Sequence, residues 1–166
     1  TRKLLSNPKT GFVSSLVLVA FFVASLSLGY GLFKNTQSLW YFQKSTQAIN
    51  SAGDISASES LMIKATQIIP NDIYYRSLSE IELIKLNAVA SQDTTKVKVE
   101  DIQKQFNDVL TNAISAAKAA QSQDPDNYLN WLALGRVYEA ISLPELKIEG
   151  AYENAQFAYA EALKRN

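Results

Sequence analysis

The chain of 166 residues contains no cysteine and no histidine. It therefore lacks disulfides, thiolate nucleophiles, histidine general bases and zinc sites built from these residues. Glycine and proline are scarce, at 6 and 4 residues, which disfavours a β fold rich in turns and favours helices. Acidic and basic residues balance at 16 each, so the basic excess typical of nucleic-acid-binding proteins is missing. The composition predicts a helical protein and points to no metal, cofactor or nucleic acid.

A basic flank, residues 1–10, precedes an uncharged apolar run from Gly11 to Phe33. As a helix rising 1.5 Å per residue, this run is about 34 Å long and can cross a hydrocarbon core of about 30 Å. We therefore expect a transmembrane helix over residues 11–34. The alternatives are a cleaved signal peptide, a buried helix of a soluble core and a pilin-like helix. The apolar region of a signal peptide is shorter, and buried helices rarely carry so long an apolar run.

The flanking charges predict the orientation of this helix. Arg2, Lys3 and Lys9 precede it, whereas Lys34 and Lys44 follow it. Basic residues are enriched on the cytoplasmic side of membrane helices. We therefore expect a cytoplasmic N-terminus and an extracytoplasmic body.

Small residues form a stripe on the predicted membrane helix. Spacings of four, three and four positions place them on one face: Ala20, Ala24, Ser27 and Gly31. Such a stripe allows a second helix to approach closely in lipid. It predicts contacts with other transmembrane helices. Chance is the alternative, because alanine, serine and glycine are common in membrane helices.

The body, residues 35–166, contains a repeat motif. The pattern W-x2-L-G-x2-Y occurs without a mismatch at Trp131, Leu134, Gly135 and Tyr138. This is the first-helix signature of a tetratricopeptide repeat (TPR), a stack of helix pairs. The small, aromatic and small positions of its second helix are held by Ala155, Tyr159 and Ala162. The connection between these helices is longer than usual by about eight residues, around residues 142–150.

The same register extends backwards to three repeats, at about residues 39–72, 73–126 and 127–166. Pro70 and Pro125 stand where repeats end. The preceding second-helix positions are held by Ser58, Met62 and Ala65, and by Ala113, Ala117 and Ala120. The middle repeat is too long, and we assign its surplus to a polar loop near residues 91–100 that leads into a helix from about Val99.

These patterns predict an all-α fold, with a single transmembrane helix followed by a TPR-like α-solenoid of about three helix pairs. The sequence contains no helix breaker between Leu32 and Ile49, so the membrane helix can continue into the first repeat. A generic bundle of alanine-rich helices is the alternative.

Polar residues near the first-helix positions are candidates for binding, because first helices line the concave groove of a TPR array. They are Gln43, Gln47, Arg76, Glu80, Arg136 and Glu139. The alternative is an ordinary solvated helix face with local ion pairs worth a few tenths of a kcal/mol each. No residue group indicates catalysis or metal binding.

Several segments together resemble a bacterial membrane arrangement. They are NPKTGF before the apolar run, YFQKSTQAIN followed by Gly53-Asp54, PNDIYYRSL, the long middle repeat, and DPDNYLNWLALGRVYEAI. In these features the chain resembles the C-terminal TPR region of O-antigen ligase/polymerase-like membrane proteins. The resemblance implies a location in the bacterial inner or cytoplasmic membrane, as part of the cell envelope. The catalytic part of such proteins lies in their multi-pass region, so no catalytic residue carries over to this chain.

Three functional hypotheses follow. The first is a membrane-anchored TPR scaffold that binds a protein or peptide and is not itself an enzyme. The second is the accessory region of a multi-pass glycan-assembly enzyme. The third is a structural subunit of a membrane-associated assembly.

Overall fold

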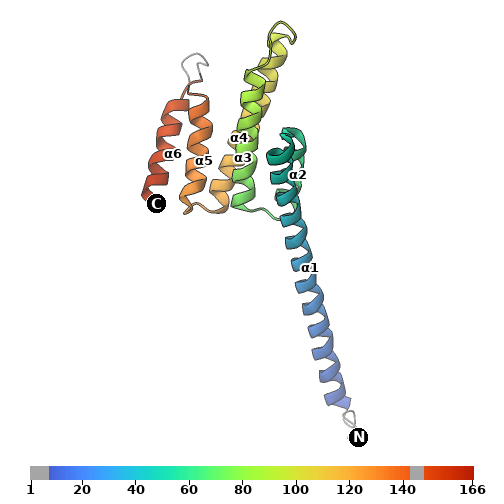
Figure 1. Ribbon diagram of the computed structural model, residues 1–166. Helices are drawn as coiled ribbons and strands as arrows, with labels where there is room; N and C mark the ends of the chain where they lie inside the picture. Colours follow the sequence, from blue (N-terminus) through green and yellow to red (C-terminus); the bar gives the residue numbers. More distant parts are fainter. Residues whose placement is uncertain (1–7, 143–147) are drawn as a thin grey trace.

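The computed structural model describes residues 8–142 and 148–166, and these form six α-helices and no β-strand (Figure 1). The helices are α1 Pro8–Ala52, α2 Ile55–Ile68, α3 Asp72–Ala90, α4 Val99–Gln123, α5 Tyr128–Ala140 and α6 Ala151–Arg165. The predicted all-α class is confirmed for this part of the chain. Most of the predicted basic flank, residues 1–7, and residues 143–147 of the predicted long connection lie outside the described residues.

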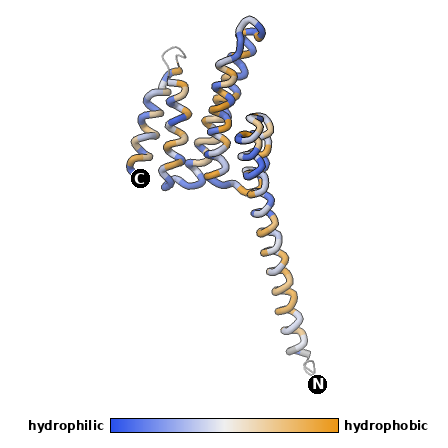
Figure 2. Tube along the Cα trace, in the orientation of Figure 1, coloured by the Kyte–Doolittle hydropathy of each residue, from blue (hydrophilic) through white to orange (hydrophobic). Residues whose placement is uncertain are grey.

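α1 is one helix of 45 residues, and its apolar N-terminal half projects away from the other helices (Figures 1 and 2). It is long and apolar enough to cross a membrane, and its most apolar stretch is not buried against the rest of the chain. The hydroxyls of Ser15, Ser25 and Thr36 each donate to the carbonyl four residues earlier. Their polar groups are therefore satisfied within the helix. The helix continues unbroken into the body, as predicted.

The predicted stripe of small residues is exposed along this helix, at Ala20, Ala24, Ser27 and Gly31. A second helix packed against the stripe stays a prediction.

Capping side chains begin the helices of the body. Asp54 caps α2, Asn71 caps α3 and Asn127 caps α5, each by accepting a hydrogen bond from a backbone amide of the first turn. Pro70 and Pro125 precede the last two of these turns. Proline cannot continue the hydrogen-bond ladder of a helix, and the caps satisfy amides that the helix start leaves unpaired.

Consecutive helices form three antiparallel pairs, α1/α2, α3/α4 and α5/α6, which lie in a row (Figure 1). α3 contacts α2, and α5 contacts both α3 and α4. One core lies at the junction of the first two pairs and includes Met62, Ala65, Tyr74 and Ile81. A larger core joins the second and third pairs and includes Leu86, Val109, Ala113, Leu134 and Val137.

Small side chains allow the paired helices to approach closely. The predicted second-helix positions are almost all buried, namely Ser58, Met62, Ala65, Ala113, Ala117, Ala120, Ala155 and Ala162. Tyr159 is partly exposed. In α5, Trp131, Leu134 and Gly135 are buried, and Tyr138 is partly buried.

The middle pair is longer than the third. α3 has 19 residues and α4 has 25, against 13 in α5 and 15 in α6. α3 ends at Ala90 and α4 begins at Val99, so the surplus residues form the predicted polar loop and also lengthen both helices.

Candidate binding groove

A surface pocket of about 340 Å³ lies between α1 and α3, with α2 contributing to its floor. We call it the first-helix pocket, because α1 and α3 are the first helices of their pairs. It is lined by Phe42, Ser45, Thr46, Ile49 and Asn50 of α1, Ser58 and Met62 of α2, and Ser77, Glu80, Ile81 and Ile84 of α3. Ligand pockets have volumes from about 300 Å³ upward, so the volume of this pocket lies at the lower end of that range.

The pocket combines an apolar floor with a polar rim. Met62 and Ile81 are buried in the floor, whereas Thr46 and Glu80 are exposed at the rim. Ile84, which also lines the pocket, is 45% exposed. Apolar walls with a few placed polar groups are typical of ligand sites, because burial supplies affinity and hydrogen bonds supply orientation.

Serine side chains fix α1 against α2. The Ser45 hydroxyl donates to the Ser58 carbonyl at 2.7 Å and lies 3.0 Å from the Ser58 hydroxyl. The Ser38 hydroxyl donates to the Ala65 carbonyl at 3.0 Å. Ser38, Ser45 and Ser58 are all fully buried. Because these side chains are short and their hydroxyl groups are hydrogen-bonded, the two helices pack closely and the wall of the pocket has a fixed position.

Two of the six predicted binding residues meet. Glu80 of α3 lines the first-helix pocket, and its Oε1 atom lies 3.7 Å from Nη1 of Arg136 on α5. About half of each side chain is exposed, so the ion pair itself contributes less than about 1 kcal/mol of stability. It does extend the polar rim of the pocket to the first helix of the third pair.

The other four predicted residues have different surroundings. Gln43 and Gln47 are exposed on α1 but do not line the pocket. Arg76 donates a hydrogen bond to Asn130 of α5 at 2.7 Å, so it joins the second and third pairs. Glu139 accepts a hydrogen bond from a tyrosine hydroxyl of α6, so it joins the two helices of the third pair.

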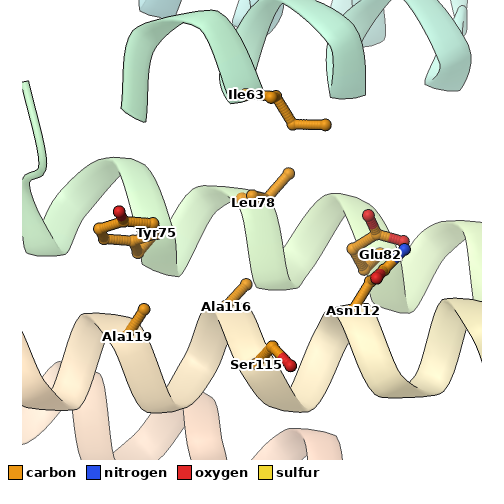
Figure 3. A pocket seen from close by; sticks show the side chains of 8 residues that line it. All are labelled: Ile63, Tyr75, Leu78, Glu82, Asn112, Ser115, Ala116 and Ala119. Atoms are coloured by element: carbon orange, nitrogen blue, oxygen red, sulfur yellow. The ribbon is translucent and has the colours of Figure 1, made fainter. Parts of the chain in front are cut away.

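Sequence reasoning missed Glu82 of α3. Its side chain is 2% exposed and lines a second pocket, of about 360 Å³, between α2, α3 and α4 (Figure 3). Burial and the negative charge of Glu59 raise the pKa of Glu82 from 4.5 to about 7, and Lys85 partly opposes this. Lys85 itself pairs with Glu59 at 2.6 Å. The sequence did contain a signal for this burial. Glu82 is the eleventh residue of α3, and the eleventh residue of α5 is Tyr138 of the repeat motif, which is partly buried.

The chemistry of both pockets suits non-covalent binding. Their linings consist of apolar side chains, hydroxyls, an amide and a single carboxyl group in each pocket. Within residues 8–142 and 148–166, no group of three or more potential metal-ligating side chains occurs. No protein-family model matches the chain, and no curated protein matches it either.

Proposed function

We propose that this chain is a membrane-anchored, TPR-like scaffold that binds a protein or peptide along the first helices of its pairs. The observation that carries this proposal is the position of the first-helix pocket. The pocket opens between α1 and α3, and the contact of Glu80 with Arg136 continues its rim to α5. The groove thus draws on all three pairs, and it acts by complementary shape and polarity without a covalent step.

The alignment of the second and third pairs supports a repeat architecture. When α3 and α5 are aligned at their first residues, equivalent positions hold similar residues. These are Tyr75 and Trp131, Leu78 and Leu134, and Ser79 and Gly135. Ser79 and Gly135 are both buried, as expected where a small residue lets another helix approach.

The groove fits an extended peptide better than a compact domain. An apolar side chain of the peptide would fill the pocket over Met62 and Ile81 and contact the exposed face of Ile84. The rim groups of Glu80 and Arg136 would then bind backbone or polar groups of the same peptide. Partners of this kind gain affinity from a few anchor side chains and orientation from the rim.

Lipid is the second partner in this proposal. The apolar half of α1 anchors the scaffold, and the basic residues before it keep the N-terminus cytoplasmic and the body extracytoplasmic. The exposed small residues of α1 provide a face for other transmembrane helices.

A peptide-display selection tests the groove. The full chain, reconstituted in lipid nanodiscs, is immobilised and used to select peptides from a random library. The selected peptides are then measured against Ile84→Glu and Thr46→Trp, which charge and fill the pocket. Val99→Glu is the control, because Val99 is similarly exposed at 50% but lies outside both pockets.

We expect both pocket variants to weaken peptide binding about tenfold or more, and the control to bind like the wild type. A selection without enriched peptides contradicts the proposal. So do peptides that bind all variants equally.

A further inference from the structure

Exposed apolar side chains gather at one end of the helical body. Ile73 in the first turn of α3 is 45% exposed, Tyr128 at the start of α5 is 37% exposed, and Leu163 in the last turn of α6 is 76% exposed. Figure 1 shows that these helix ends lie at the end of the body from which the apolar half of α1 emerges. Trp40, 51% exposed, lies on α1 two residues after Ser38, whose hydroxyl donates to Ala65 in the last turn of α2. We call Trp40, Ile73, Tyr128 and Leu163 the membrane-side edge.

The membrane-side edge also holds an apolar pocket. Its volume is about 310 Å³, and it is lined by Tyr128, Leu132, Tyr159, Ala162, Leu163 and Asn166. The first and fifth residues of α3 are Asp72 and Arg76. Asp72 accepts a hydrogen bond from Asn127, the N-cap of α5, and Arg76 donates one to Asn130 of α5. The same positions of α5 hold Tyr128 and Leu132. The edge of the third pair is therefore apolar where the edge of the second pair is polar and covered.

α1 sets the height of this edge above the membrane. The hydrogen bond from Ser38 to Ala65 ties α1 to the last turn of α2. Ser38 follows the end of the apolar run, Phe33, by five residues, which is about 7.5 Å of helix. The polar layer on each side of a bilayer is about 5–8 Å thick. The end of α2, and the start of α3 next to it, therefore lie at the depth of the lipid headgroups.

The third pair carries no excess of positive charge at this edge. Lys164 and Arg165 in the last turn of α6 both pair with Glu161, and the exposed Asp124 and Asp126 lie in the turn before α5. Such an edge gains little from anionic lipids. Its tryptophan and tyrosine are the residue types that are enriched at the membrane interface.

We propose that the membrane-side edge docks in the interfacial layer of the bilayer, with Ile73, Tyr128 and Leu163 inserted among the lipid headgroups and Trp40, about 10.5 Å beyond Phe33 along α1, at the outer boundary of that layer. This inference rests on the proposed membrane anchor, because α1 fixes the height of the edge. The body then lies on the membrane surface, and apolar burial rather than net charge holds it there.

Fluorescence quenching by lipid tests this docking. The chain has no cysteine, so single cysteines can be labelled with an environment-sensitive fluorophore without background. The variants are Ile73→Cys and Leu163→Cys at the edge, and Val99→Cys and Tyr152→Cys away from it. Tyr152 is the matched control, because it lies in the first turn of α6, whereas Leu163 lies in the last turn. Leu26→Cys reports on insertion of α1. Each variant is measured in phosphatidylcholine nanodiscs with and without nitroxide-carrying lipids. The nitroxide is near the headgroup for the labels on the body and on the acyl chain for position 26, which lies about 10.5 Å below the end of the apolar run.

We expect the labels at positions 26, 73 and 163 to lose most of their emission, and those at 99 and 152 to keep it, at low and high salt alike. Quenching at 26 without quenching at 73 and 163 overturns the docking and leaves the anchor intact. Equal quenching at 152 and 163 also overturns the docking. A label at 26 that is not quenched overturns the membrane anchor, and with it both proposals. The labelled residues are exposed, and circular dichroism checks that each variant folds.

Discussion

The ring of Tyr159 lies so close to Gly135 that a Cβ atom on residue 135 would be 2.5 Å from its Cε1 atom. Non-bonded carbon atoms do not approach so closely, so a larger residue at this position must displace the Tyr159 ring or move α5 and α6 apart. The Tyr159 hydroxyl donates to Glu139, one turn further along α5, and this hydrogen bond holds the ring in place. The glycine of the W-x2-L-G-x2-Y motif thus has a direct steric reason.

Replacing Gly135 by alanine should destabilise the third pair. We expect the free energy of unfolding to fall by about 1–3 kcal/mol, because the added methyl group overpacks the α5–α6 contact. Thermal unfolding followed by circular dichroism measures the change. Gly29→Ala is the control, since nothing lies within 4 Å of a Cβ atom there and Gly29 is not in the stripe of small residues. In Gly135→Ala/Tyr159→Leu the smaller side chain should recover part of the loss, and a fully additive double variant would contradict the steric explanation.

Glu82 should make stability depend on pH. Burial, followed by the negative charge of Glu59, raises its pKa from 4.5 to about 7. Between these values the folded chain holds a proton on Glu82 that the unfolded chain has lost, so the free energy of unfolding falls as pH rises. The contribution is complete below about pH 4.5 and is lost through about pH 7. Its size is on the order of 1–3 kcal/mol.

Glu82→Gln removes this dependence, because the amide stays neutral at all these pH values. We expect the variant to gain stability relative to the wild type as pH rises from about 5 to about 8, measured by thermal unfolding at each pH. Glu80→Gln is the matched control on the same helix, because half of the Glu80 side chain is exposed. If Glu82→Gln keeps the pH slope of the wild type, Glu82 is not protonated in the folded chain.

Asn130 should be essential for the junction of the second and third pairs. It is fully buried, accepts a hydrogen bond from Arg76 and donates to Asp72 at 3.1 Å and to the Asp124 carbonyl at 2.9 Å. Asn130→Ala removes three hydrogen bonds, although Asp72 still accepts one from Asn127, and should cost about 1–3 kcal/mol. Hydrogen exchange should accelerate in α5 and α6 and stay slow in α2. The exposed Asn107 supplies the control, Asn107→Ala, and equal exchange in both variants would contradict this role.

The contact between Glu80 and Arg136 should matter for binding more than for stability. Because the pair is half exposed, Arg136→Glu should change the free energy of unfolding by less than about 1 kcal/mol. Peptides selected on the groove should nevertheless bind this variant more weakly. The exchanged variant Glu80→Arg/Arg136→Glu restores attraction but reverses the rim charges, so we expect it to regain stability and not binding. Unchanged peptide affinity in both variants would show that the rim takes no part.

Local signals in the sequence predicted the helices well. The absence of a helix breaker between Leu32 and Ile49 predicted that α1 continues into the body, and Pro70 and Pro125 predicted the boundaries that precede α3 and α5. The polar stretch before Val99 predicted the start of α4. These signals act within a few residues, so a single sequence is sufficient to read them.

Side-chain partners from distant elements could not be predicted in this way. Helical position suggested Arg76 for the groove, but its partner Asn130 lies 54 residues away and comes from the next pair. Glu139 similarly bonds to α6. The burial of Glu82 depends on three helices that enclose it. The resemblance to O-antigen ligase/polymerase-like proteins stays a prediction.

The unbroken course of α1 also has a mechanical consequence. Residues 8–52 form one helix, so no joint separates the apolar half of α1 from the wall of the first-helix pocket. The buried side chains of Ser38 and Ser45 hold α2 against the same helix through hydrogen bonds. A force on an occupant of the pocket, directed across the axis of α1, therefore exerts a torque on the whole helix. In the proposed membrane arrangement, the body and the apolar half of α1 would tilt or turn together, so a force on the body would be transmitted into the bilayer.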